Sequence, residues 1–329
     1  MAEIETPAGV ADDLREALRF VLGDAGVVWD PALLAARSGD WSEATKTPPA
    51  LVLLPRTPQQ VADVLALCAR HRQRIVVQGG LTGLAGGATP APAEVALSLA
   101  RLDQIEDVDA VGGTATVQAG VVLEELQARV ESQDWYFPLD LGARGSCQLG
   151  GNAATNAGGN RVIRYGTMRE LVQGIEVALP DGRLLTMMNR VTKNTTGIDL
   201  KHLFIGAEGT LGVITRLVLK LSPRPTASST ALCALPSFEA ALGLLKLWDL
   251  SPREHPLFTK KLSCGIFRLK TVRKNKDRRR GPPLARLLCW SRPRLLRQAQ
   301  PIAHGPATDF RLRSDVQRYR PDDGSRLMD

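Results

Sequence analysis

The most constraining feature of this sequence is a run of small residues that follows an apolar segment. Arg74–Val77 has the composition of a buried strand, and it leads directly into Gln78, Gly79, Gly80, Leu81, Thr82, Gly83 and Leu84. Glycines let backbone N–H groups converge without side-chain bulk, and converging N–H groups bind anions. The run has neither the G-x-G-x-x-G spacing nor the G-x-x-x-x-G-K-[ST] spacing of phosphate loops. Alone, it is as consistent with a tight structural turn as with a binding loop.

A β-α-β unit precedes this run. Leu51–Leu54 is a short apolar strand that Pro55 ends. Thr57 and Pro58 suit the N-cap and the first position of the helix that follows. Further elements are expected as helices at Ala11–Leu22, Val121–Val130 and Phe238–Trp248, and as strands at Val95–Leu99, Ile105–Asp109, Thr114–Ala119, Val172–Leu179, Arg183–Thr186, Leu211–Leu221 and Ala231–Leu235.

A second stretch of small residues runs from Cys147 to Gly159 and is interpreted as a loop. It contains Gly150, Gly151, Asn152, Ala153, Ala154, Thr155, Asn156, Ala157 and Gly158. Glycines admit a flat ligand at van der Waals distance, and amide and hydroxyl side chains offer donors and acceptors to its edge. An exposed loop could share this composition, but it would not need the apolar residues between the glycines.

A third stretch, Ile205–Ile214, is a turn that leads into a buried strand. Glu208 is the one acid in this apolar neighbourhood, between Gly206 and Gly209. We expect Glu208 to cap or brace the adjacent backbone rather than to act in catalysis.

Together these stretches resemble the flavin-binding domain of the vanillyl-alcohol oxidase or PCMH type, in particular that of the D-2-hydroxyacid dehydrogenases such as the D-2-hydroxyglutarate dehydrogenases. The resemblance rests on Gly79–Gly87, on Cys147–Gly166, and on Lys193–Phe204 continuing into Glu208–Gly212, and it covers roughly residues 40–225. It implies an α+β fold with two subdomains and FAD between them.

The resemblance also implies which residues contact the cofactor. The pyrophosphate would lie against Gly79–Leu84, the isoalloxazine ring against Gly150–Gly159, and the cofactor edge against Gly209 and Ile214. In relatives with covalent flavin a histidine follows the two glycines, and Leu81 stands there in this chain, so non-covalent FAD is expected. The whole expected set is Gln78, Gly79, Gly80, Leu81, Thr82, Gly83, Leu84, Cys147, Gly150, Gly151, Asn152, Asn156, Gly158, Gly159, Gly166, Glu208, Gly209 and Ile214. Mild departures from the family pattern are Ile198, often Tyr, and Ala207, often Ser.

The implied reaction is hydride transfer from the α-carbon of a D-2-hydroxy acid, of the D-2-hydroxyglutarate, D-lactate or glycolate class, to the flavin. A quinone or an electron-transfer protein would then accept the electrons. Relatives carry their general base and a metal site of two histidines and a carboxylate on a cap domain beyond about residue 225. His71, His202, His255 and His304 fit no such motif, so no catalytic or metal-binding residue is assigned and impaired FAD binding and turnover are expected.

The chain divides by composition into four parts. Residues 1–47 are an N-terminal helical segment, 48–225 the FAD domain, 226–250 the start of a truncated cap, and 251–329 an irregular basic tail with 20 Lys+Arg against 7 Asp+Glu. Excess Arg and Pro without periodicity is what a reading-frame shift in a GC-rich gene would give. Alternatives are a flavin-binding subunit whose cap comes from a partner chain, or a basic-tailed nucleic-acid-binding protein, although no nucleic-acid fold accompanies the charge.

The five cysteines suggest a reducing compartment. None is in a C-x-x-C pair and their number is odd, which disfavours a disulfide framework or a zinc site. No apolar run reaches the about 18 residues of a membrane span, and no leader is visible near Met1. A cytoplasmic location is therefore expected.

Overall fold

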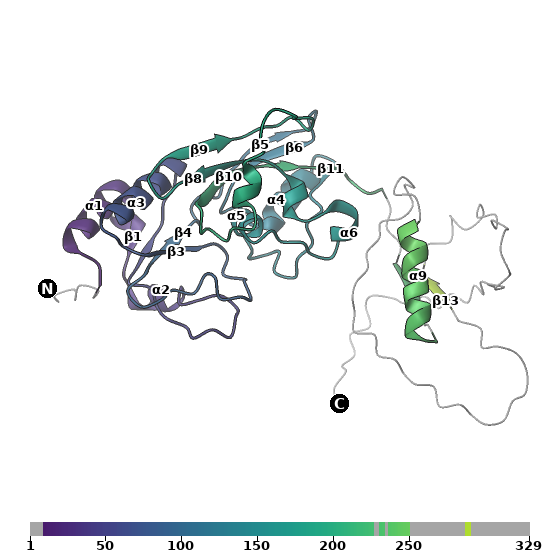
Figure 1. Cartoon of the computed structure of the whole chain (residues 1–329), viewed down its shortest axis with the longest axis horizontal. Helices are drawn as coiled ribbons and strands as arrows, with labels where there is room; N and C mark the ends of the chain where they lie inside the picture. The colour runs from purple at the N-terminus through teal and green to yellow at the C-terminus, as the bar shows by residue number, and fades with distance from the viewer. Residues whose placement is uncertain (1–8, 227–229, 234–235, 251–286, 291–329) are drawn as a thin grey trace, which may run out of the picture. The chain divides into compact units, whose positions relative to one another are not determined.

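The computed structural model describes residues 9–226, 230–233, 236–250 and 287–290 (Figure 1). Contacts divide the chain into two compact units, of which the first extends to Pro225. No helix among the described residues is long and apolar enough to cross a membrane.

The first half of this unit contains a mostly parallel four-stranded sheet, in the order β1-β2-β4-β3. Its strands are β1 (Val27–Val28), β2 (Leu51–Leu53), β4 (Val95–Ser98) and β3 (Ile75–Gln78), with β2 and β3 parallel to β4 and β1 antiparallel to β2. Helices α1 (Asp12–Leu22) and α3 (Pro58–Arg70) pack against each other and the sheet. Between them come a 3-10 turn η1 (Asp24–Gly26) and a short helix α2 (Pro31–Ala35).

The start of α3 shows why the sequence predicts it well. The hydroxyl of Thr57 accepts a hydrogen bond from the N–H of Gln60 at 3.1 Å, which satisfies one of the N–H groups that every helix leaves free at its first turn. The residues that α3 buries, such as Val61 and Leu65, recur at helical spacing.

The second half is a five-stranded antiparallel sheet, in the order β5-β6-β10-β8-β9. Its strands are β5 (Ile105–Asp109), β6 (Thr114–Gln118), β10 (Val213–Lys220), β8 (Val172–Ala178) and β9 (Leu184–Met187). Helices α4 (Leu123–Glu131) and α5 (Leu149–Ala154) lie on one side of this sheet (Figure 1), and Leu126 and Leu149 join its inner residues in one core. Strands β7 (Trp135–Tyr136) and β11 (Ser222–Pro223) form a separate two-stranded antiparallel sheet.

Helix α3 also connects the two sheets. It contacts β8, β9 and β10 as well as its own sheet, and a Cβ added to Gly182 would come within 2.7 Å of the Ala66 Cβ. Ala178 and Val213 of the second sheet belong to the same buried cluster as Val61. The two halves therefore share apolar core rather than a polar linker.

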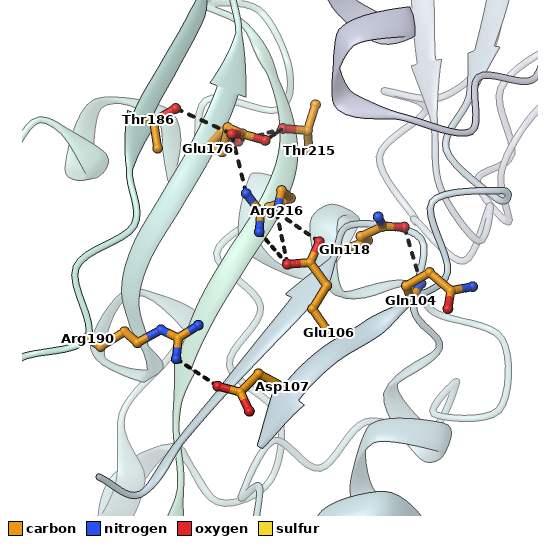
Figure 2. A network of polar contacts seen from close by, with 9 residues as sticks. All are labelled: Gln104, Glu106, Asp107, Gln118, Glu176, Thr186, Arg190, Thr215 and Arg216. Atoms are coloured by element: carbon orange, nitrogen blue, oxygen red, sulfur yellow. Dashed lines mark hydrogen bonds and ion pairs between the residues drawn. The ribbon is translucent and has the colours of Figure 1, made fainter. Parts of the chain in front are cut away.

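A polar network lies on the second sheet (Figure 2). The Arg216 Nε donates to a Glu106 oxygen at 2.8 Å, and the Arg216 Nη1 lies 3.6 Å from the Glu176 Oε2. Hydrogen bonding to Glu106 is the main reason that the pKa of Arg216 is raised. The pairing of β10 with β8 shifts between Ile214 and Arg216, and Thr215 at this irregularity donates to Glu176 at 3.0 Å. Such a bulge re-aims side chains, so both Thr215 and Arg216 contact the same buried carboxylate.

Most of the expected elements are confirmed, with shifts of one or two residues at their ends. The expectation of a loop from Cys147 to Gly159 is wrong, because α5 occupies its middle. Small residues permit this helix to lie close to its neighbours: a Cβ on Gly150 would be 2.5 Å from the Ala119 Cβ. Two further short helices were not expected, α6 (Val162–Tyr165) and α7 (Met168–Leu171).

Beyond Pro225 the structure describes three elements. β12 (Thr230–Cys233) and α9 (Phe238–Leu250) match the strand and helix expected there. β12 pairs with β13 (Leu287–Trp290), a strand that was not expected within the basic tail. Otherwise residues 251–329, including His255 and His304, lie outside the described residues.

Candidate functional site

The three stretches of small residues, which we call the first loop (78–87), the second segment (147–159) and the third loop (205–214), lie together. A Cβ on Gly80 would overlap the carbonyl oxygen of Ser146, next to the second segment, and one on Gly79 would lie 3.4 Å from the Gln148 Oε1. The N–H of Glu208 donates to the carbonyl of Ala154 at 2.9 Å. Segments far apart in sequence thus meet around one region.

The first loop has a row of free backbone donors. Within the part of the chain that the structure describes, the N–H groups of residues 79–85 have no acceptor. Most residues of the loop are only partly buried or are exposed, including Gly83 and Leu84. A glycine-rich turn with several unpaired N–H groups is suited to an anion such as a pyrophosphate.

Two buried amide oxygens beside the first loop also lack partners among the described residues. They are the Oε1 atoms of Gln78 and Gln148. The Gln78 Nε2 is satisfied, since it donates to the carbonyls of Arg37 and Ala88 at 2.8 and 2.9 Å. A buried polar atom without a hydrogen bond is costly, so these oxygens fit a site whose ligand supplies donors.

Backbone strain occurs in all three stretches. Leu81, Asn156 and Glu208 adopt positive φ angles of 56°, 50° and 52°. Non-glycine residues rarely adopt such angles, and they persist where the surrounding structure holds them. Each of the three stretches therefore contains a residue that the surrounding structure holds in an energetically unfavourable backbone conformation.

The second segment uses most of its polar side chains internally. The Asn156 Oδ1 accepts from the N–H of Arg169 at 2.9 Å, and the Thr155 hydroxyl donates to the carbonyl of Gly151. The Asn152 Nδ2 lies 3.6 Å from the Sγ of Cys147, whose pKa burial raises. Gly151 is different, because a Cβ there would meet no atom within 4 Å. The open face of this segment is thus its backbone at Gly151.

Three other glycines that were expected to contact the cofactor lie close to neighbouring residues of the chain. Gly166 ends α6 with a φ of 81°, and a Cβ there would lie 2.6 Å from the Glu170 Cβ. A Cβ on Gly159 would overlap the Asp140 carbonyl oxygen, and Gly158 lies near Val162. The contacts at Gly159 and Gly166 explain these two glycines without a ligand, whereas Gly158 has only ordinary van der Waals contacts. Cofactor contact at all three positions stays a prediction.

In the third loop, Gly209 lies beside β3, since a Cβ there would be 3.6 Å from the Val77 Cγ2, whereas the Ile214 side chain is buried in the core. The expectation that the Glu208 side chain braces the backbone is wrong. Its carboxylate is exposed and has no hydrogen bond within the described ranges, and the bracing comes from its N–H. The carboxylate points to the first loop, where a Cβ on Gly87 would lie 3.1 Å from its Oε2.

Two residues that were not singled out in the sequence fix these loops. Arg169 donates from its Nη1 to the carbonyl of His202 at 2.9 Å and from its Nη2 to that of Ile205. Asp40 accepts from the N–H of Gly86 at 3.0 Å. Neither lies in a glycine-rich motif, so composition carried no signal. The Arg164-Tyr165-Gly166 stretch close to Arg169 was the nearest available hint.

Neither described histidine belongs to the three stretches, although the His202 carbonyl accepts from Arg169, which also binds the third loop at Ile205. His71 ends α3, as its position at the end of a predicted helix suggested. His202, in α8 (Lys201–Phe204), lines an open cavity of about 590 Å³ with Arg169, Lys201 and Lys220, and none of the three stretches lines it. No group of three potential metal ligands occurs among the residues described.

Comparison with known proteins agrees with this geometry. Residues 49–188 match the FAD binding domain family. The chain is 46% identical over 201 residues to a probable D-2-hydroxyglutarate dehydrogenase of Oryza sativa subsp. indica, covering 61% of this chain and 36% of that protein. It is 43% identical over 213 residues to a D-2-hydroxyglutarate dehydrogenase of Xanthomonas citri pv. viticola, covering 65% and 45%.

Solved structures show the same fold. Alkyldihydroxyacetonephosphate synthase matches with a TM-score of 0.66 at 24% identity, over 73% of this chain and 46% of that one. p-Cresol methylhydroxylase matches with a TM-score of 0.60 at 19% identity, over 73% and 49%. The chain spans less than half the length of these curated relatives and structures. Residues 49–188 thus match an FAD binding domain, the chain is similar over 201 residues to a D-2-hydroxyglutarate dehydrogenase, and it shares its fold with p-cresol methylhydroxylase.

Proposed function

We propose that this chain supplies the flavin-binding part of an enzyme that oxidises a D-2-hydroxy acid. The observation that carries the proposal is the row of free N–H groups at residues 79–85, which meets the two other glycine-containing stretches. The curated relatives that share this part of the sequence are named for D-2-hydroxyglutarate or, in one yeast protein, for D-lactate.

The residues divide the work of binding as follows. The N–H groups of the first loop hold the pyrophosphate of FAD, and the second segment holds the ring at Gly151, where the backbone is open. FAD, when bound, supplies an acceptor for the hydride of the substrate α-carbon. Glu208 is the one acid of the third loop, and its exposed carboxylate keeps that side of the region polar.

Binding of FAD is proposed to be non-covalent. Leu81 offers no nucleophile where a flavin-linking histidine would stand. Cys147 is the one cysteine in the three stretches, and its thiol is buried with a raised pKa, which keeps it protonated and unreactive. Acid precipitation of the flavin-loaded protein should therefore release all of the flavin into the supernatant, whereas yellow precipitate would show a covalent link.

The proposed substrate class is that of D-2-hydroxyglutarate, D-lactate or glycolate, and the proposed electron acceptor is a quinone or an electron-transfer protein. The cytoplasmic location expected from the sequence stays a prediction, and the rice and cattle relatives are named as mitochondrial.

The deciding experiment loads the purified full chain with FAD and then adds D-2-hydroxyglutarate without oxygen. Bleaching of the flavin absorbance by the D but not the L enantiomer supports the enzyme. Flavin uptake without bleaching supports the alternative of a binding subunit whose substrate side comes from a partner. Failure to take up flavin contradicts both. When glycine variants of the binding segments are compared in this assay, Gly142→Ala is a matched control, because a Cβ at this exposed position meets no atom within 4 Å.

A further inference from the structure

A segment upstream of the FAD domain match wraps the first loop. The match begins at residue 49, yet the N–H of Trp41 donates to the carbonyl of Gly83 at 2.9 Å. The carbonyl of Arg37 accepts from the Gln78 Nε2 at 2.8 Å. Residues 37–47, which we call the clamp segment, therefore contact the start and the middle of the first loop.

The centre of the clamp segment is the carboxylate of Asp40. Only 5% of Asp40 is exposed. Its Oδ2 accepts from the N–H of Gly86 and its Oδ1 from that of Ser42, both at 3.0 Å. A Cβ on Gly83 would lie 3.0 Å from the same Oδ2. One side chain thus joins the clamp segment to the far end of the first loop.

The charge of Asp40 suits this position. Burial raises its pKa, but hydrogen bonds from the side chain and N–H of Ser42 and from the N–H groups of Ala88 and Gly86 outweigh burial and leave the pKa below its ordinary value. The clamp segment also carries Arg37, Glu43 and Lys46, and the Glu208 carboxylate lies beside Gly87, next to Gly86. None of the described residues forms an ion pair with the Asp40 carboxylate. Backbone N–H groups and the Ser42 hydroxyl satisfy it.

This arrangement separates two sets of N–H groups in one loop. The N–H of Gly86 points to Asp40, while those of residues 79–85 have no acceptor in the described chain. A fixed anion that binds one end of the loop holds the remaining donors in place before a ligand arrives, and such preorganisation strengthens binding.

We propose that Asp40 is a positioning residue for the cofactor's pyrophosphate, and that the functional flavin-binding unit begins at about Arg37 rather than at the start of the matched domain. The proposal rests on the function proposed above. Asp40 acts through the loop backbone and touches no reacting atom.

The test compares Asp40→Asn with Asp109→Asn in the full chain. Asp109 is a matched control, because its Oδ1 also accepts two backbone N–H groups, those of Val111 and Gly112, at 2.9 and 2.8 Å, in a hairpin of the second sheet. Asparagine has nearly the same shape, but it turns one acceptor oxygen into a donor that faces an N–H. We expect FAD binding about 10- to 100-fold weaker for Asp40→Asn and unchanged for Asp109→Asn.

Hydrogen exchange of the flavin-free protein is the second measurement. Asp40→Asn should speed exchange at the N–H groups of Gly86 and Ala88, which donate to Asp40, and leave the second sheet unchanged. The lowered pKa means that the stabilising contact is present above the unfolded pKa of about 3.9 and is lost only as pH falls below it. Protection of these residues, corrected for intrinsic rates, should therefore stay constant from about pH 8 to pH 5. A protection midpoint near neutrality would overturn the assignment to Asp40.

The outcomes separate this inference from the proposed function. If the unmodified protein binds FAD and Asp40→Asn binds it equally well, the positioning role is wrong and the function stands. If the unmodified protein binds no FAD, the proposed function and the role of Asp40 in FAD binding are both wrong. If hydrogen exchange is also unchanged in Asp40→Asn, the contact between Asp40 and the first loop is refuted as well. Should Asp40→Asn fail to fold, Gly83→Ala presses a methyl against the same carboxylate oxygen and should weaken FAD binding in the same direction, by less.

Discussion

Replacing Gly151 with alanine should stabilise the protein and weaken its cofactor binding at the same time. Gly151 lies inside α5, and a Cβ there meets nothing within 4 Å. Alanine is favoured over glycine in a helix by up to about 1 kcal/mol. In a unit of this size about 1 kcal/mol corresponds to a rise of roughly 2–4 °C in Tm. The flavin-free variant should therefore melt slightly higher than the unmodified protein.

The effect on binding has the opposite sign. If the flavin ring packs on the open backbone at Gly151, an added methyl occupies its space, and overpacking of this kind costs about 1–3 kcal/mol. FAD affinity should then fall roughly 5- to 150-fold. Differential scanning fluorimetry of the flavin-free protein and titration of FAD fluorescence measure the two effects. Gly142→Ala should leave FAD affinity unchanged. A Gly151→Ala variant that melts higher and binds FAD normally would show that the ring does not lie against this helix.

Three further predictions concern loop shape, the sheet and a buried thiol. Gly80→Ala should reduce FAD binding and lower Tm, by about 1–3 kcal/mol in unfolding free energy, because its Cβ would overlap the Ser146 carbonyl; unchanged melting would contradict this contact. Arg216→Met, which removes the ion pair with Glu106, should lower the free energy of unfolding measured in urea by about 1–3 kcal/mol. This loss is smaller than for a fully buried ion pair because Arg216 is partly exposed. Glu106→Gln should lower the free energy of unfolding by less than Arg216→Met. Burial raises the pKa of Cys68 to about 12, so this thiol stabilises the fold below its unfolded pKa of about 8.5 and loses that contribution as pH rises toward 12. Iodoacetamide at pH 8 should label Cys68, mapped by mass spectrometry, only as fast as the protein unfolds, and labelling at the rate of a free thiol would refute its burial.

The sequence predicted an element correctly where a local interaction between neighbouring residues determines that element. Thr57 and Pro58 marked the start of α3, because a helix cap depends on local geometry alone. The convergence of the three stretches was not visible in any one of them. It came from resemblance, since their meeting depends on long-range packing such as that of Gly80 against Ser146.

Other features could not be derived because tertiary contacts decide them. Helix α5 forms in a sequence of glycines and an asparagine that has low helix propensity, and packing against Ala119 outweighs that propensity. Glu208 bonds through its backbone N–H to the carbonyl of Ala154, a contact that only the tertiary packing of the third loop on α5 creates. Asp40 is one of two acids in an irregular segment, and its role depends on its long-range contact with Gly86 of the first loop.

The packing of α3 between the two sheets has a practical consequence for anyone who dissects this protein. A cut between β4 and β5 would separate Val61 from Ala178 and Val213, which form one buried cluster, and would expose apolar surface on both pieces. Fragments made there should aggregate when expressed alone and recover only when produced together. The smallest soluble piece that can be expected to retain the flavin site is therefore the whole of the first unit, from α1 to Pro225.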